Sequence, residues 1–444
     1  MAVTATLAAA VIVTVPLTLP ARAATSAANL PAAAGLKAYV YSGTGYTFTE
    51  GDGTYTQHLL DGRVIWFFSD SFLGAVGSGG SRGPSGMLHN QIVVQDSPTA
   101  SGASNFHNVW PNGWGTNSFA ASGCAAEWPA ASIQSTLNTV QVVLRCVDSS
   151  GNVVRLDLAT LTINSGLTGW TVSIDTANFD SAARVQTPTC YPDTGNSQVD
   201  FGQSIMQLFG TTYIYGVQHC PNTVHAYVAR VSGNDLSQTG SWQYWDGGGP
   251  GWTSRSAGGE YGVAAMTSAG SPLIHAGSEY SVVYDPNRGV YRMIATDIGL
   301  GPKIDEYTAT ADPSGPWTFA GTIDNTQTDG VYGSKPTNDA GSPCTLTTYG
   351  AKEQPAFESN GDIVFTYNVN VTGCSAADAE TAYEASVANY DPVFMYGWAG
   401  RTVTRQVLPP AAAIRGAPSP WARPLRRQRS GRPKRSTAQS LTGR

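Results

Sequence analysis

The chain has 444 residues, of which 13% are charged, 10% are aromatic and 50 are glycine. Few charges with many glycines and aromatic residues are typical of secreted all-β proteins and exclude a disordered chain. The formal net charge is −6, but residues 401–444 carry eleven Lys or Arg and no acid, which leaves 14 basic and 31 acidic residues in positions 1–400. A body this acidic excludes nucleic acid as its main partner.

Residues 1–24 are predicted to be a secretory signal peptide. The run from Leu7 to Leu19 is apolar, and Ala21-Arg22-Ala23 fits a small-x-small cleavage site, although the usual basic residues before the run are missing. The run is shorter than the roughly 20 residues that a membrane span needs. We therefore expect a secreted, extracellular protein without membrane contact in its mature form, with residues 25–35 as a linker after the signal.

Six cysteines behind an export signal predict disulfides. The cysteines are Cys124, Cys146, Cys190, Cys220, Cys344 and Cys374. Their spacing favours pairing between neighbours, although fifteen connectivities are possible. No C-x-x-C motif or histidine cluster indicates zinc, and we expect no cofactor; a structural calcium ion is compatible with the sequence but not specified by it.

Hairpin-like strand pairs recur along the chain. Examples are residues 139–147 with 153–158, 212–217 with 224–231, and 280–284 with 290–295. Trp170, Trp242 and Trp317 close three of these units at intervals of 72 and 75 residues. A closing Trp at this period favours propeller blades of about four strands. Residues 36–408 then form a single-domain five-bladed β-propeller, and a pair of β-sandwiches is the alternative.

The last part of the chain differs from this pattern in two places. Residues 376–388 form the one good helix candidate, with Ser375 as its N-cap, inserted in the last blade. Residues 409–444 are rich in Ala, Pro and Arg and are predicted to be a disordered basic tail. This tail either adheres to anionic wall polymers or is a mis-read end that replaces the last strand, and the second reading is favoured by its lack of pattern.

Two carboxylates stand out in the stretch from Glu50 to Gly74. Asp52 lies in a Gly-Asp-Gly turn, and Asp70 follows the apolar strand Val64–Phe68. A charge at the end of a buried strand is costly unless it is paired or functional. The Asp61-Gly62 turn makes one hairpin-like unit of the region, so both carboxylates are expected at one end of a central channel.

Paired carboxylates are what glycoside hydrolysis needs, because one gives a proton to the leaving oxygen while the other attacks or activates water. Other acids precede aromatic or strand-opening residues and are candidates to converge on the same face. They are Glu127, Asp200, Glu260, Glu279 and Glu353. Each acid has a structural alternative as a turn residue or as a partner of loop amides. The histidines show no ligand spacing and are expected in the core or in loops, with His275 the one that lies close to a candidate acid.

Residues 51–74, with His89-Asn90, resemble the opening of a mainly actinobacterial family of secreted five-bladed β-propellers. That family was long catalogued as a domain of unknown function and is associated with endo-D-arabinanase activity. The segments GSEYSVVYDPNRGVYRMIATD, ATADPSGPWTFAG and GDIVFTYNVN resemble blades of the wider furanosidase-type hydrolases, so the resemblance spans about residues 36–400. It implies a retaining furanosidase whose two catalytic aspartates map to Asp52 and Asp70. The family more often has Gly where this chain has Ser69.

We therefore expect a secreted, monomeric glycoside hydrolase that cleaves arabinofuranosyl linkages in a polysaccharide. Asp52 and Asp70 are the expected catalytic pair, with neither yet assigned as acid or nucleophile. The expected substrate-binding residues are Asn90, Trp128, Glu260, His275 and Glu279. The alternatives are a carbohydrate-binding propeller at the cell wall without catalysis, and an exported structural protein whose tail docks on the wall.

Overall fold

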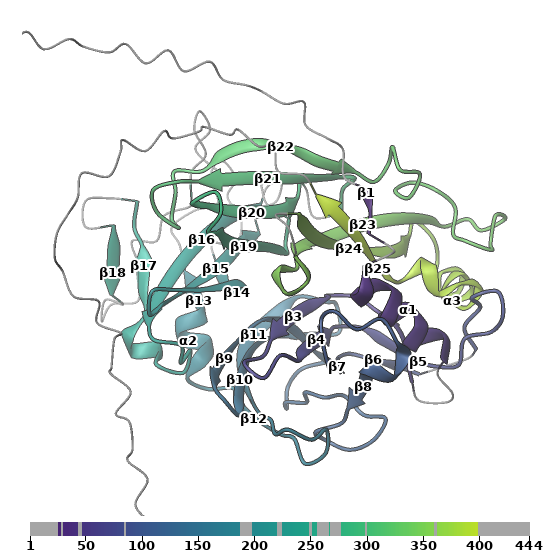
Figure 1. The fold of residues 1–444 in the computed structure, drawn as a ribbon, viewed down its shortest axis with the longest axis horizontal. Coiled ribbons are helices and arrows are strands. Elements are labelled where there is room, and N and C mark those ends of the chain that lie inside the picture. The colour runs from purple at the N-terminus through teal and green to yellow at the C-terminus, as the bar shows by residue number, and fades with distance from the viewer. Residues whose placement is uncertain are drawn as a thin grey trace, which may run out of the picture. The chain divides into compact units, whose positions relative to one another are not determined.

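Antiparallel β-sheets make up most of the fold (Figure 1). The computed structural model describes residues 25–27, 30–42, 47–83, 86–186, 198–219, 224–247, 251–254, 266, 277–297, 300–358 and 362–397. These all belong to one compact unit, Thr18–Arg401. The all-β class is confirmed. The predicted signal peptide and basic tail lie outside the described residues.

Five larger sheets follow one another along the chain. The first contains β3 (Tyr55–His58), β4 (Val64–Phe68), β7 (Gln91–Gln95) and β8 (Phe106–Val109), and the second β9 (Ala126–Thr136), β10 (Thr139–Val147), β11 (Val153–Thr162) and β12 (Thr171–Asp175). The third contains β13 (Arg184–Gln186), β14 (Gln198–Leu208), β15 (Thr211–His219), β16 (Val224–Ser232), β17 (Gln243–Trp245) and β18 (Trp252–Ser254). The fourth contains β19 (Tyr280–Asp285), β20 (Val290–Thr296), β21 (Lys303–Ala309) and β22 (Thr318–Asn325). The fifth contains β23 (Thr345–Glu353), β24 (Ile363–Thr372), β25 (Pro392–Gly397) and β1 (Thr25–Ser26).

The three predicted closing tryptophans occupy one structural position. Trp170, Trp242 and Trp317 each stand directly before the fourth strand of their sheet, counted from β9, β14 and β19. All three are buried. The interval that was visible in the sequence therefore marks the same place in three successive sheets.

Neighbouring sheets pack against one another in chain order. Strand β3 contacts β9, β9 contacts β14, β14 contacts β19, and β19 contacts β23. The apolar cores lie between consecutive sheets, and one of them joins the first sheet to the fifth through Trp66, Phe357 and Phe394. The last sheet is thus in contact with the first.

Within the predicted linker, residues 25–27 and 30–35 belong instead to a strand and a helix or adjoin them. Strand β1 pairs with β25, with Thr25 opposite Tyr396 and Ser26 opposite Met395. Helix α1 (Pro31–Ser42) then begins at a proline, which suits a first helical position because its missing N–H needs no partner there. The alanine-rich start of this helix resembles a linker, so the helix was not predicted from the sequence.

Other local predictions agree with the structure. Helix α3 (Ala376–Ala385) has Ser375 as its N-cap, whose side chain accepts a hydrogen bond from the Asp378 amide. The remaining short helices are α2 (Phe179–Ala183), η1 (Ala103–Asn105), η2 (Thr239–Ser241), η3 (Pro355–Phe357) and η4 (Val387–Asn389). Within the described part of the chain, none of the helices has the length and apolar character needed to cross a bilayer.

Two disulfides join neighbouring cysteines, as predicted. Cys124 pairs with Cys146 and Cys344 with Cys374. Cys190 and Cys220 lie outside the described residues, so their predicted pairing stays a prediction.

A small sixth sheet contains the strand before Asp52 and the strand after Asp70. It contains β2 (Thr47–Gly51), β5 (Ser71–Gly74) and β6 (Met87–Leu88). The chain passes from β2 to β3 through a turn in which Gly53 has φ +77° and Thr54 has φ +37°. A Cβ atom on Gly53 would lie 2.5 Å from the Ser69 Oγ, so glycine is needed both for backbone conformation and for space.

Replacing Gly53 with alanine tests this requirement. We expect Gly53→Ala to lower the free energy of unfolding by about 2–3 kcal/mol, because backbone strain and a steric clash add. The matched control is Gly289→Ala, where φ is +66° and a Cβ atom would meet open space. The control should lose only about 1 kcal/mol. Equal losses in chemical denaturation would contradict the close approach at Gly53.

Candidate active site

Asp52 and Asp70 are neighbours across a backbone ladder. The Asp52 amide donates to the Asp70 carbonyl at 3.1 Å, and the Ser69 amide donates to the Asp52 carbonyl at 2.9 Å. Asp52 lies where the chain leaves β2 for β3, and Asp70 lies where it leaves β4 for β5. Both strands therefore change sheets at the same point, which places the two predicted aspartates side by side.

The turn that carries Asp52 is held by the fifth sheet. The Thr54 hydroxyl donates to the Asn368 Oδ1 at 2.6 Å, and the Gln354 side-chain amide donates to the Thr54 carbonyl at 3.1 Å. Thr54 is a β-branched residue at positive φ, a conformation that persists only where surrounding contacts over-determine it. These contacts from β24 and from the end of β23 supply that restraint.

The carboxyl group of Asp52 is in an environment that favours its protonated form. Burial raises its pKa to about 7, and the nearby charges of Asp70 and Glu279 act in the same direction. The Tyr349 hydroxyl donates a hydrogen bond to the Asp52 Oδ2, which lowers the pKa and limits the rise. A carboxyl group tuned in this way can give and take a proton near neutral pH.

The carboxyl group of Asp70 has different neighbours. The Trp128 Nε1 donates to its Oδ1 at 3.0 Å, and the His89 Nδ1 lies 2.9 Å from the same oxygen. The Asp70 side chain is 22% exposed, so substrate can reach it. Two ring nitrogens thus fix one oxygen of a partly exposed carboxylate and orient the group.

Asn90 has a structural part rather than the predicted contact with substrate. Asn90 is fully buried, and its amide donates to the carbonyls of Phe119 and Glu127 at 2.9 and 2.8 Å. Its Oδ1 accepts from the Phe119 amide at 2.7 Å. By holding the Glu127 carbonyl, Asn90 positions the following residue, Trp128, against Asp70.

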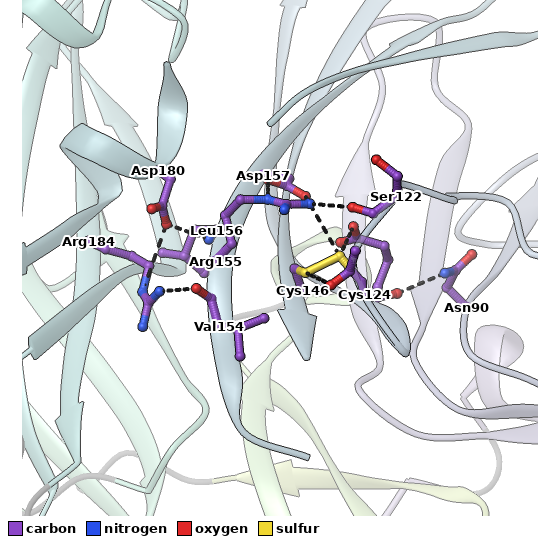
Figure 2. Close-up of a disulfide and its surroundings, with 12 residues drawn as sticks. Asn90, Ser122, Cys124, Cys146, Val154, Arg155, Leu156, Asp157, Asp180 and Arg184 are labelled. Carbon is purple, nitrogen blue, oxygen red and sulfur yellow. Dashed lines mark hydrogen bonds and ion pairs between the residues drawn. A yellow bond between two sulfur atoms is a disulfide. The ribbon is translucent and has the colours of Figure 1, made fainter. Parts of the chain in front are cut away.

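The Cys124–Cys146 disulfide secures the same segment from its other side. Figure 2 shows this disulfide between Asn90 and the ion pair of Arg155 with Asp157. Cys124, Cys146, Glu127 and Asp157 also place potential metal ligands close together. The two sulfurs form a disulfide and therefore offer no thiolate ligand. These four residues do not fit a metal centre.

Glu279 also differs from the prediction of a substrate contact. Glu279 is 8% exposed. Each of its carboxylate oxygens has a cationic partner: the Arg145 Nη2 lies 2.7 Å from Oε1, and the Lys352 Nζ lies 2.5 Å from Oε2. Burial raises the pKa of Glu279, but Lys352 and Arg145 outweigh burial and lower it to about 2. Glu279 is a buried ion beneath the site.

The other acids expected at the site are occupied elsewhere or lie outside the described residues. Asp200 pairs with Arg184 at 3.0 Å, and Glu353 pairs with Arg292. Glu127 lies beside Asp157, and burial and that carboxylate raise its pKa to about 8. Glu260 and His275 lie outside the described residues, so their predicted roles stay predictions.

A cavity of about 210 Å³ is lined by residues of all five larger sheets. Residues from β3, β9, β14, β19 and β23 line it, including Tyr55, Gln203 and Lys352. Neither Asp52 nor Asp70 is among its lining residues.

Most of the residues that bind the two aspartates or shift the pKa of Asp52 were not predicted from the sequence. His89 was expected to be a core or loop histidine, yet its position directly before Asn90 in the resembling motif was a usable signal. No such signal marks Arg145 in β10, Tyr349 and Lys352 in β23, or Tyr390, which also hydrogen-bonds to Asp52 and follows η4. No motif of the sequence includes them.

Residues 37–398 match the family model described as "Domain of unknown function (DUF5005)". A comparison with curated proteins found no match. Several solved structures that resemble the chain are glycoside hydrolases.

A presumed hydrolase from Bacteroides ovatus has a TM-score of 0.61 and 19% identity, covering 83% of this chain and 90% of that chain. This likeness shows a shared fold. Two further structures are more distant and support no inference. One is an α-L-arabinofuranosidase from Podospora anserina, with a TM-score of 0.37 and 13% identity, covering 79% of this chain and 91% of that chain. The other is a family 117 glycoside hydrolase from Zobellia galactanivorans, with a TM-score of 0.40 and 10% identity, covering 80% of this chain and 88% of that chain.

The raised pKa of Asp52 predicts a dependence of stability on pH. The folded-state value of about 7 exceeds the ordinary 3.8, so the stability contributed by Asp52 is complete below pH 3.8 and is lost as the pH rises to about 7. Asparagine mimics the protonated form and avoids this loss. We expect Asp52→Asn to match the wild type near pH 4 and to exceed its free energy of unfolding by about 2–4 kcal/mol at pH 8.

Asp235→Asn provides a control of opposite sign. Burial raises the pKa of Asp235, but hydrogen bonds from Ser237 and Gln141 outweigh burial and lower it to about 2. This variant should be less stable than the wild type above pH 4, with the difference closing as the pH falls towards 2. A pH-independent difference for Asp52→Asn in urea denaturation would contradict the assigned environment.

Proposed function

The chain belongs to the DUF5005 family, and from the geometry around Asp52 and Asp70 we propose that it is a retaining glycoside hydrolase acting on arabinofuranosyl linkages. The observation that carries the proposal is the contrast between the two carboxyl groups. The pKa of the Asp52 carboxyl group is raised to about 7 by burial and by the charge of Asp70, and its Oδ1 is a buried atom, whereas the Asp70 carboxyl group is held by two ring nitrogens. Paired carboxyl groups in unlike environments mark an acid and a nucleophile.

From this contrast we propose the roles that the sequence left open. Asp52 is the acid/base and protonates the glycosidic oxygen as its bond to the anomeric carbon breaks. Asp70 attacks that carbon and forms a glycosyl ester, with Oδ1 held by Trp128 and His89. Water then cleaves the ester while Asp52 takes its proton, which returns both groups to their starting state. This mechanism requires carboxyl groups about 5–5.5 Å apart, and their neighbouring backbone positions support such a separation.

The substrate class rests on the resemblance of residues 51–74 and His89-Asn90 to the actinobacterial endo-D-arabinanase family. Trp128 is partly exposed beside Asp70 and would contact the furanose ring. A D-arabinan of the cell wall is the substrate we propose.

The five sheets support a five-bladed propeller over a pair of sandwiches. The inner strands contact one another in chain order, and the fifth sheet packs on the first. In a propeller, loops at one end of the inner strands converge on one site. The two disulfides and the predicted signal peptide support secretion, and we propose a monomer without a cofactor.

Release of oligosaccharides from arabinogalactan by the purified protein is the direct test. We expect Asp70→Asn and Asp52→Asn each to lower kcat by about 10³-fold or more, since each removes a group that acts in the chemical step. Asp312→Asn is the control, because the Asp312 Oδ1 accepts from the Ser314 amide at 2.8 Å and from the Ser314 hydroxyl within its own turn, away from Asp52 and Asp70 in the chain. Its activity should equal that of the wild type.

Product stereochemistry separates the proposal from its alternatives. NMR of freshly released product should show retention at the anomeric carbon. Inversion would contradict Asp70 as nucleophile. Binding of furanoside polymers without turnover by the wild type would instead support a carbohydrate-binding protein, and activity unchanged by Asp70→Asn would reject the site.

A further inference from the structure

Three charged side chains from three different sheets meet beneath Asp52. Arg145 comes from β10, Glu279 directly precedes β19, and Lys352 comes from β23. We call them the Arg145–Glu279–Lys352 cluster. All three residues are buried, with exposed fractions of 7%, 8% and 2%. Each carboxylate oxygen of Glu279 accepts from one cation, so the cluster holds one more positive than negative charge.

The cluster is in contact with the group that binds Asp52. The Lys352 Nζ also donates to the Gly350 carbonyl at 2.9 Å, and Gly350 follows Tyr349, the hydroxyl donor to Asp52. A Cβ atom on Gly350 would lie 2.8 Å from the Glu279 Oε2. Gly350 has φ +63° and lies where the register of β23 with β24 shifts between Tyr349 and Lys352. The cluster therefore packs directly on the bulge that positions Tyr349.

The charges of the cluster also act on Asp52 through space. Burial and the charge of Asp70 raise the pKa of Asp52, and the negative charge of Glu279 adds to the rise. Burial lowers the pKa of Lys352, and the charges of Glu279 and Asp52 oppose that fall. Burial also acts to lower the pKa of Arg145, but the charges of Glu279 and Asp52 contribute to raising it. The titratable and charged groups that face Asp52 are Asp70 from its own hairpin, Glu279, Arg145, Lys352, and the phenols of Tyr349, Tyr383 and Tyr390. Without Glu279, the two buried cations Arg145 and Lys352 would face Asp52 and Asp70 with no anion of their own cluster to offset them.

We propose that Glu279 is a positioning residue whose charge offsets Arg145 and Lys352, so that Asp52 keeps its proton until the glycosidic oxygen takes it. This inference deepens the proposed function and rests on it for its catalytic meaning. The physical claim about where the proton resides does not depend on any substrate. Removing the anion or a cation of the cluster should move the titration of Asp52 in opposite directions, which a merely structural cluster would not do.

The test is the titration of Asp52 in protein labelled with ¹³C at the aspartate carboxyl carbons. The Asp52 signal is identified by its loss in Asp52→Asn. We expect Glu279→Gln to lower the pKa of Asp52 by about one unit or more, because Lys352 and Arg145 are then unopposed. We expect Lys352→Met to raise it by a similar amount. Glu279→Asp, which keeps the charge, should stay close to the wild type.

Glu353→Gln is the matched control. Glu353 is a buried carboxylate whose Oε2 accepts from the Arg292 Nε at 2.7 Å, outside the Arg145–Glu279–Lys352 cluster. The control should leave the Asp52 titration in place. Shifts of the same sign in Glu279→Gln and Lys352→Met, or no shift in either, would overturn the proposal. If Glu279→Gln does not fold, Lys352→Met decides alone, and an upward shift is then required.

Enzyme kinetics separates this inference from the proposed function. In an active enzyme, the alkaline limb of the pH profile of kcat/KM reports the acid that must be protonated. That limb should move with the Asp52 titration in each variant. Opposite NMR shifts in a protein that hydrolyses no furanoside would uphold the role of Glu279 in holding the proton and reject the proposed function.

Discussion

The pairing of Asp52 with Asp70 across a single backbone ladder is the constraint on which the candidate site depends. Both strands leave one sheet for another at this point, so the two carboxyl groups are neighbours although they belong to different turns. The site therefore needs no flexible loop to bring its aspartates together. What surrounds them decides how they differ: aromatic nitrogens hold Asp70, and burial with a phenol donor conditions Asp52.

Burying several charges near one another is costly unless each is compensated. Here the compensation runs through three sheets, because Arg145, Glu279 and Lys352 come from the second, fourth and fifth. The arrangement ties the electrostatics of the site to the packing of the whole unit. A change in how the sheets meet would alter both the charges around Asp52 and the contacts that hold its turn.

The sequence predicted the features that depend on residues close together in the chain. The apolar strand before Asp70, the Gly-Asp-Gly turn, the Ser375 cap and the tryptophan interval all appear in the structure. Helix α1 was missed because its alanines and single proline resemble a linker, and Asn90 and Glu279 were given substrate contacts because burial is not visible in a motif. Tyr349 and Lys352 could not be found, since only the contact of the fifth sheet with the first brings them to Asp52.

That contact has a consequence for the order of synthesis. The partners that hold the Asp52 turn, Asn368 and Tyr349, lie 314 and 297 positions after the residues they bind. The ribosome therefore makes the two aspartates well before the side chains that set the protonation of Asp52, which are separated from it by 297 residues or more. A nascent or truncated chain therefore carries both aspartates without the environment that makes them chemically distinct. The chemical difference between the two aspartates is therefore acquired only after Tyr349 and Asn368 have been made and have folded against the Asp52 turn.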